Sequence, residues 1–277
     1  MAFQPSMPFP GYLMSNALER GLCALELLAG KAAGLPLQQI SEGLGIAPSA
    51  THRMLTCLVE QGYVRQDPQH GNYILALKVI SLALKHLAHA SVVDLARPIL
   101  ERLAGESGEL VRLGIVDGEH LVWVAKAQGT RSGLRYDPDA GAEAKLGCTA
   151  SGLAWLSCLS DEQALELVYR QGLPKPGEYG PNAPTTVEAL LNNLHQARAD
   201  GYACVNESFE AGAAAIATAL YHPGQSTPSG VISIAGPSVR LSAERMQALV
   251  PALLAAAKDL AQTELGSVPK FSTMTAT

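Results

Sequence analysis

The chain has 277 residues, about twice the usual length of a single domain, which favours two domains. Hydrophobic residues make up 48% of the sequence and charged residues 16%, and no apolar run approaches the roughly 20 residues of a membrane-spanning helix. These features exclude disordered and membrane-spanning proteins. Because the first fifteen residues also lack the Lys or Arg of a secretion signal, we expect a cytoplasmic protein without membrane contact.

The cysteines and the distribution of charge limit the possible classes of protein further. The five cysteines form an odd set without a C-x-x-C pair, which argues against a disulfide framework and against a zinc ribbon. The formal net charge is −5, yet residues 12–90 contain six Lys or Arg against five Asp or Glu. This difference favours an anionic partner for that segment, although nucleic-acid modules are often more basic.

The N-terminal segment begins with residues 1–11, which hold four prolines or glycines and no charge and are predicted to be a disordered arm. A first helix is predicted from near Ser15 to Gly30, and a second over residues 36–45, where Ile40 and Leu44 share a face. We expect the first helix to bury the apolar residues that recur at helical spacing, which are Leu18, Leu22, Leu25 and Leu28.

The third predicted helix begins at Pro48 and ends before Gly62. One side is apolar and is expected to face the core through Ala50, Met54, Leu55 and Leu58. The opposite side carries polar residues that recur every three or four positions, which are Ser49, His52, Arg53 and Thr56. The major groove of DNA admits one helix of this kind, with short polar groups and an Arg on its outer side. The alternative is an ordinary solvated helix face.

In residues 63–75, apolar and polar side chains alternate on both sides of a turn at Asp67–Gly71, and this pattern predicts a β-hairpin. Three helices followed by a hairpin predict a winged helix-turn-helix DNA-binding domain over residues 12–76, against the alternative of a small helical domain that only packs. At the hairpin tip, Arg65, His70 and Asn72 are candidates for contacts with phosphates or the minor groove. An Asn at position 72 is explained equally well by the preference of turns for this residue type.

A linker helix is predicted over residues 77–91, and its apolar residues occur on more than one side, so we expect it to lie between other elements. His86 and His89 are three residues apart on this helix, a spacing compatible with a shared metal ion. No third ligand is evident nearby, and no metal or cofactor is predicted.

Residues 92–266 are expected to form the second domain. A helix over 92–106 precedes a strong hairpin signal around Asp117–Gly118, and a possible strand lies in the GLRYDP segment after Ser132. Later helices are expected at 149–159, at 160–172 with a Ser160/Gln163 capping box, and after a second box at Thr185 and Glu188. Three strands within 203–237 and a helix over 242–265 complete an α+β domain with a mainly antiparallel sheet, before a disordered tail at 267–277.

The start of the helix near residue 149 is the most informative segment of this domain. Free backbone amides there, beside the hydroxyls of Thr149 and Ser151, would suit a ligand carboxylate, unless Thr149 simply caps the helix. Cys148 at the same place raises the alternative of an enzyme with a nucleophile of lowered thiol pKa, although no histidine neighbours it in the sequence. Glu207, at a strand end, is a candidate for a ligand hydroxyl or a second subunit, or it is a polar turn residue.

Three stretches together resemble the IclR family of bacterial transcription regulators. LERGLCALELLA resembles the family's first helix, and the segment from LPLQQISEGLGI to HGNYIL resembles its winged helix-turn-helix. GYACVNES with the following strands up to GVISIAGP resembles the end of its effector domain. The likeness spans about residues 15–265 and agrees in order, spacing and domain content.

The resemblance implies a non-enzymatic regulator that binds double-stranded DNA at a palindromic operator as a homodimer or a dimer of dimers. It also implies a GAF-like effector domain, with helices flanking a curved antiparallel sheet and a pocket for a small organic or aromatic acid. The residues expected to contact DNA are Pro48, Ser49, Thr51, His52, Arg53, Thr56, Arg65, His70 and Asn72. The residues expected around the effector are Tyr136, Ala144, Cys148, Thr149, Ala150, Ser151, Val205, Glu207, Ala213, Ala215, Ser233 and Ala235.

Two departures from the family pattern bear on the effector. Many members read P-L-H-x-T-A-x-G-K-A where this chain has residues 145–154, so the usual His and Lys are missing, and Ala215 replaces a common Cys. We therefore expect an effector bulkier and more apolar than a two- or three-carbon acid. The predicted function is a ligand-responsive regulator of a catabolic operon, and the alternatives are a Cys148-dependent enzyme and a sensor or scaffold that does not bind DNA.

Overall fold

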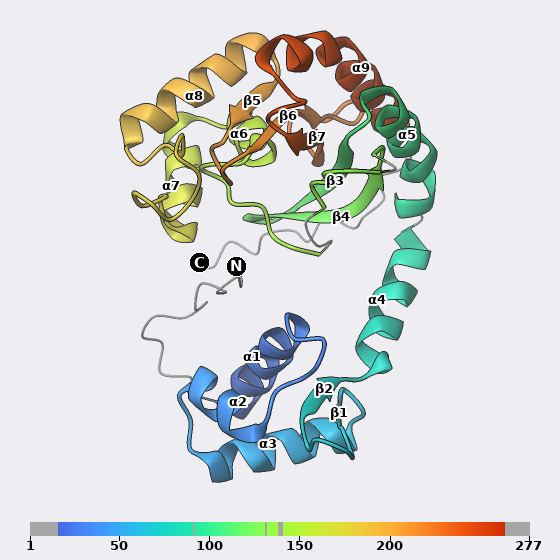
Figure 1. Cartoon of the computed structure of the whole chain (residues 1–277), viewed down its shortest axis with the longest axis vertical. Helices are drawn as coiled ribbons and strands as arrows, with labels where there is room; N and C mark the ends of the chain where they lie inside the picture. The colour runs from blue at the N-terminus through green and yellow to red at the C-terminus, as the bar shows by residue number, and fades with distance from the viewer. Residues whose placement is uncertain (1–15, 91, 131, 138–140, 264–277) are drawn as a thin grey trace. The chain divides into compact units, whose positions relative to one another are not determined.

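The computed structural model describes residues 16–90, 92–130, 132–137 and 141–263 (Figure 1). The chain divides into two compact units, Met1–His89 and Ala90–Thr277. Within the described residues, none of the helices combines the length and apolar character needed to cross a membrane. The predicted arm at 1–11 and tail at 267–277 lie outside the described residues.

Up to Leu75, the described part of the N-terminal unit consists of three helices and a two-stranded antiparallel hairpin, as the sequence predicts for a winged helix-turn-helix (Figure 1). Asn16 caps the first helix, because its side chain accepts a hydrogen bond from the backbone N–H of Glu19 at 2.8 Å. Gly45 ends the second helix in the left-handed conformation that favours glycine. The elements are α1 (Ala17–Ala29), α2 (Leu37–Leu44), α3 (Pro48–Glu60), β1 (Val64–Gln66) and β2 (Tyr73–Leu75).

The core of this unit differs from the prediction on α1. Leu18 and Leu22 are 73% and 52% exposed, whereas Gly21, Ala24 and Leu28 form the buried side. The predicted leucine stripe is therefore wrong in its first two members. Ala24 and Leu28 belong to the core of this unit, in which α1 contacts α2, α3 and β2.

Helix α4 (Leu77–Ala90) follows β2. Its described apolar side chains are largely exposed in the single chain: Leu77 is 79% exposed, Ile80 54% and Leu82 47%. The expectation that this helix lies between other elements is not met at these positions in the single chain. An exposed apolar surface of this kind is typical of a face that a second molecule covers.

The C-terminal unit is built on a five-stranded antiparallel sheet in the order β4-β3-β7-β6-β5. Helices α5 and α9 cover one face and α6 covers the other, with α7 and α8 beside it (Figure 1). The elements are α5 (Val92–Ser107), β3 (Leu110–Asp117), β4 (His120–Gln128), α6 (Ala150–Leu156), α7 (Asp161–Gln171), α8 (Val187–Asp200), β5 (Ala203–Asn206), β6 (Ala213–Leu220), β7 (Gly230–Pro237) and α9 (Ala243–Gln262).

Alternation along the strands separates two hydrophobic cores. Val111 and Leu113 of β3 pack with α5 and α9, together with Ile232 and Ile234 of β7. On the other face, Trp123 of β4 packs with α6 and α8. Successive side chains of β3 point to opposite faces of the sheet. Arg112, which lies between Val111 and Leu113, therefore points to the α6 side.

Some predicted details differ. The Ser160/Gln163 capping box is confirmed, but the next helix is capped by Thr186, whose hydroxyl accepts from the N–H of Ala189 at 3.2 Å, and not by Thr185. The helix begins at Val187, so the third residue after its cap is Ala189 and no Glu completes a box. The GLRYDP segment is not a strand in its described residues. Side-chain bonds hold it instead, such as that from Nε2 of Gln128 to the carbonyl of Tyr136 at 3.0 Å.

Candidate DNA-binding helix and effector pocket

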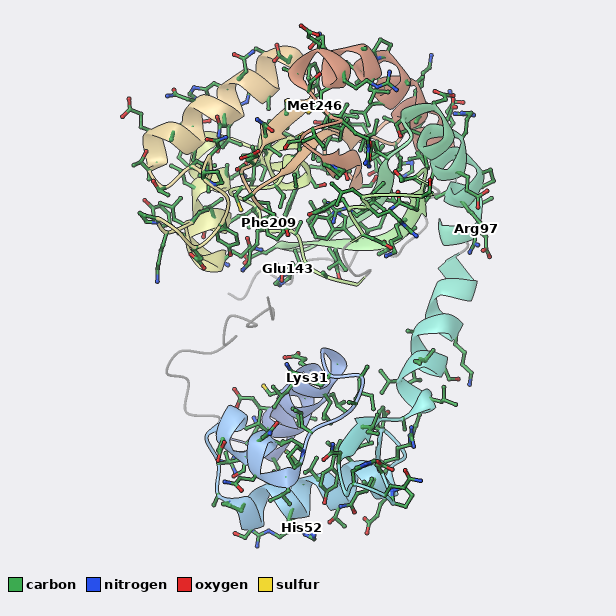
Figure 2. All side chains as sticks on the ribbon, in the orientation of Figure 1. Lys31, His52, Arg97, Glu143, Phe209 and Met246 are labelled. Atoms are coloured by element: carbon green, nitrogen blue, oxygen red, sulfur yellow. The ribbon has the colours of Figure 1, made fainter. Side chains whose placement is uncertain are left out.

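Helix α3 presents a polar outer face. Leu55 is fully buried beneath it, while the residues exposed on the outer side include Pro48, Ser49, His52, Arg53 and Thr56. Figure 2 shows His52 on the side of α3 that faces away from α1 and α2. Arg53 makes no ion pair with a carboxylate among the described residues, so its guanidinium is available to a phosphate or a base edge.

Thr51 requires a correction. Its side chain is fully buried, and its Oγ1 donates to the carbonyl oxygen of Ala47 at 3.2 Å. Thr51 and Leu55 are four residues apart and therefore share the inner face of the helix. Thr51 is thus a core residue that cannot contact DNA in this structure.

The hairpin tip is partly occupied by its own turn contacts. Nδ1 of His70 lies 2.7 Å from Oδ2 of Asp67, and this bond lowers the pKa of the Asp67 carboxyl. Asn72 is half-buried and donates to the carbonyl oxygen of Ala33 at 3.4 Å. Arg65 is exposed on β1. Arg65 is therefore the side chain of the wing best placed for a phosphate.

The predicted effector residues on the strands share the α6 face of the large sheet. The register aligns Val205 of β5 with Ala215 of β6, and Ala215 with Ala235 of β7. These neighbours form a floor of short side chains, and Ser233 lies two residues before Ala235 on the same face. Ala144, Ala150 and Ser151 are buried in the layer above this face. The structure therefore brings most of the predicted set together.

Arg112 belongs to this site, and the sequence reasoning missed it. Its side chain is 5% exposed, and its guanidinium carbon lies 3.7 Å from the ring centroid of Trp123 and 6.0 Å from that of Tyr136. Burial lowers the pKa of Arg112 to about 10, so it remains charged at neutral pH. None of the described carboxylates forms an ion pair with it. A charged residue between the apolar Val111 and Leu113 of β3 was the signal that could have identified it.

The start of α6 differs from the predicted anion site. Thr149 caps the helix, since its hydroxyl accepts from the N–H of Gly152 at 3.0 Å and donates to the carbonyl of Lys145 at 2.8 Å. Cys148 is fully buried, and burial raises the pKa of its thiol to about 12. The prediction of a lowered thiol pKa is wrong because desolvation outweighs the effect of the helix terminus. Cys148 is a protonated core thiol in this structure.

Glu207 lies elsewhere. Its φ of 51° is positive, and its Oε1 accepts from Oγ of Ser238 at 3.2 Å. Together with the start of α9 and the loop before it, Glu207 lines a cavity of about 260 Å³. This cavity is on the α9 side, so Glu207 does not join the group around Arg112.

Metal ligation finds no support in the described part of the chain, where no group of three or more His, Cys, Asp or Glu side chains could hold an ion. The side chains of His86 and His89 lie outside the described residues.

Comparison with known proteins agrees with this architecture. Residues 84–262 match the family described as "Bacterial transcriptional regulator IclR C-terminal", and residues 17–68 match the "IclR helix-turn-helix domain". The acetate operon repressor of Salmonella typhimurium is 28% identical over 254 residues, 91% of this chain and 90% of that protein. The transcriptional repressor AllR of Salmonella paratyphi A is 31% identical over 255 residues, 92% of each chain.

A solved structure has the same fold. It is an IclR homolog from Microbacterium hydrocarbonoxydans complexed with 4-hydroxybenzoate, which has a TM-score of 0.73 and 21% identity and covers 88% of this chain and 97% of that one. The two matched domains occur here in the order of the family, and one of them spans more than half of the chain. The relatives are transcriptional repressors and not enzymes. The chain therefore belongs to the IclR family of bacterial transcriptional regulators.

Proposed function

We propose that this chain is a ligand-responsive transcriptional regulator of a catabolic operon, which acts in the bacterial cytoplasm and senses a small organic or aromatic acid. The observation that carries the proposal is the polar outer face of α3, where Ser49, His52 and Arg53 are exposed on a helix-turn-helix domain. The relatives named above are repressors, which favours repression.

DNA binding is assigned to α3 and the hairpin. Arg53 would donate to a guanine edge or a phosphate, Ser49, His52 and Thr56 would contact the groove and backbone, and Arg65 would contact a phosphate beside it. A palindromic operator requires two copies, supplied by a homodimer or a dimer of dimers. The exposed apolar side chains of α4, Leu77 and Ile80, support such an assembly.

Effector binding is assigned to the α6 side of the large sheet. The solved homolog of the same fold that holds 4-hydroxybenzoate supports an aromatic acid as the effector class. Binding that favours one arrangement of the DNA-binding domains would alter operator affinity about 5- to 150-fold, which corresponds to a coupling of about 1–3 kcal/mol.

The test is a selection of bound duplexes from a random DNA library, followed by fluorescence anisotropy on the selected operator. Arg53→Ala is expected to weaken operator binding by about 1–3 kcal/mol and to relax one base preference. Arg97→Ala is the matched control, because Arg97 is an exposed Arg on α5 in the other unit. Failure to enrich any sequence would favour the sensor or scaffold alternative, and equal affinities for the wild type and Arg53→Ala would remove Arg53 from recognition.

A further inference from the structure

We propose that Arg112 and Ser233 together receive the carboxylate of the effector, and that Trp123 and Tyr136 beside them select a flat aromatic monocarboxylate. This inference rests on the proposed function, because it assigns the effector to the α6 side of the sheet.

The two polar residues face each other across neighbouring strands. Arg112 on β3 is the register partner of Ser233 on β7, and both side chains point to the α6 face. They are 5% and 1% exposed, yet neither Nε of Arg112 nor Oγ of Ser233 has a hydrogen-bond partner among the described residues. Buried polar atoms are almost always partnered in folded proteins. Two such atoms on paired residues indicate a site for one external acceptor that serves both.

The charge of that acceptor follows from the surroundings of Arg112. Two acids are engaged elsewhere: Glu109 pairs with Arg240, and Asp137 pairs with Lys126. Glu210, whose charge acts on Tyr136, is exposed, and no ion pair joins it to Arg112 in the described part of the chain. A buried guanidinium without a counter-charge is costly, and a carboxylate, whose two oxygens match the fork of an Arg, removes that cost. Because a single guanidinium and one hydroxyl are present, the site suits a monoanion.

The ring preference follows from the apolar neighbours. Trp123 lies against the guanidinium and is fixed by a bond from its Nε1 to Oγ of Ser151 at 3.4 Å. Beside Ser233, the floor formed by Ala215 and Ala235 offers only methyl groups. An aromatic ring attached to the bound carboxylate would lie over these methyls, with Tyr136 as a further ring contact.

The experiment measures ligand binding by calorimetry and by thermal shift on the full chain. The probes are benzoate and 4-hydroxybenzoate, with benzamide and acetate as controls that lack the charge or the ring. The wild type is expected to bind a benzoate at least tenfold more tightly than either control. Arg112→Met should lose at least 30-fold in this affinity, and Ser233→Ala about threefold to tenfold. Arg112→Lys should recover part of the loss, since Lys keeps the charge but not the fork.

Two further measurements separate this role from a structural one. Without ligand, Arg112→Met should melt at a higher temperature than the wild type, because it removes an unpaired buried charge. It should also retain operator binding, while its operator affinity no longer responds to benzoate. An acid that binds Arg112→Met as tightly as the wild type would overturn the inference and leave the proposed function intact. Failure of every aromatic acid to stabilise the wild type, together with a lower melting temperature for Arg112→Met, would also overturn it.

Discussion

Arg240 holds both carboxylate oxygens of Glu109, with Nε 2.6 Å from Oε1 and Nη2 2.8 Å from Oε2. Glu109 directly precedes β3 and is 4% exposed, while Arg240 follows β7. Nη1 of Arg240 also donates to the carbonyl oxygen of Leu134 at 2.9 Å. This forked pair therefore joins the ends of two central strands to the segment that carries Tyr136.

Replacement of Arg240 by Met is expected to destabilise the chain. Glu109 would remain buried without its partner, and since the Arg240 side chain is 36% exposed, we expect a loss of about 2 kcal/mol, below the ~3–5 kcal/mol typical of a fully buried pair. Urea denaturation measures the change. The double variant Glu109→Gln/Arg240→Met should regain part of the loss, because it removes the unpaired charge. A single variant as stable as the wild type would show that the pair contributes nothing.

Gly236 on β7 is predicted to tolerate no side chain, because the Glu109–Arg240 pair lies against it. A Cβ there would overlap Oε2 of Glu109 and lie 2.7 Å from its Cδ, and Arg240 prevents the carboxylate from moving away. Gly236→Ala is expected to cost about 1–3 kcal/mol in urea denaturation. Gly105→Ala is the control: Gly105 lies in α5, a Cβ there meets none of the described atoms within 4 Å, and the change should stabilise the chain by up to about 1 kcal/mol. Equal effects of the two changes would contradict the prediction.

The fold could be predicted from the sequence where local signals are strong. The capping box at Ser160, the Asp117–Gly118 hairpin and the helix opened by Pro48 each depend on residues within one or two turns. The buried face of α1 could not be predicted in the same way. Two sets of residues on α1 have helical spacing, and the buried set is Gly21, Ala24 and Leu28. Two of these three residues are small, so a search for regularly spaced leucines does not find this face.

The effector site was harder to predict because its chemistry is not local. Arg112, Trp123 and Ser233 come from three strands, and only the register of the sheet shows that they meet. The thiol of Cys148 illustrates a second limit. A helix start predicts a lowered pKa, but burial, which the sequence does not reveal at a single position, reverses the direction.

Cys148 is predicted to be chemically inert in the folded protein. With its thiol pKa raised to about 12, only about 10⁻⁴ of it is thiolate at pH 8, and it is also inaccessible. Mass spectrometry after brief iodoacetamide treatment should therefore find Cys57, which is exposed, alkylated and Cys148 unmodified until urea is added. Rapid labelling of Cys148 in the native protein would revive the enzyme alternative.

The same burial predicts a pH dependence of stability. Above the ordinary thiol pKa of 9.0, the unfolded chain ionises Cys148 whereas the folded chain keeps it protonated, so stability should fall as the pH rises. Between pH 9 and 10.5 the wild type should lose up to about 1.4 kcal/mol per pH unit more than Cys148→Ala. Parallel urea-derived stability curves for the two proteins would contradict this.

The two threonines of α3 should separate folding from recognition. Thr51 is fully buried and donates to the carbonyl of Ala47, so Thr51→Val should cost at most about 1 kcal/mol of stability and leave operator affinity unchanged. Thr56 is exposed, and its hydroxyl donates to the carbonyl of His52 at 2.9 Å, which leaves the oxygen able to accept from outside. Thr56→Val should keep the urea midpoint and weaken operator binding in anisotropy. The reverse pattern, with affinity lost in Thr51→Val and kept in Thr56→Val, would mean that α3 presents a different face to DNA.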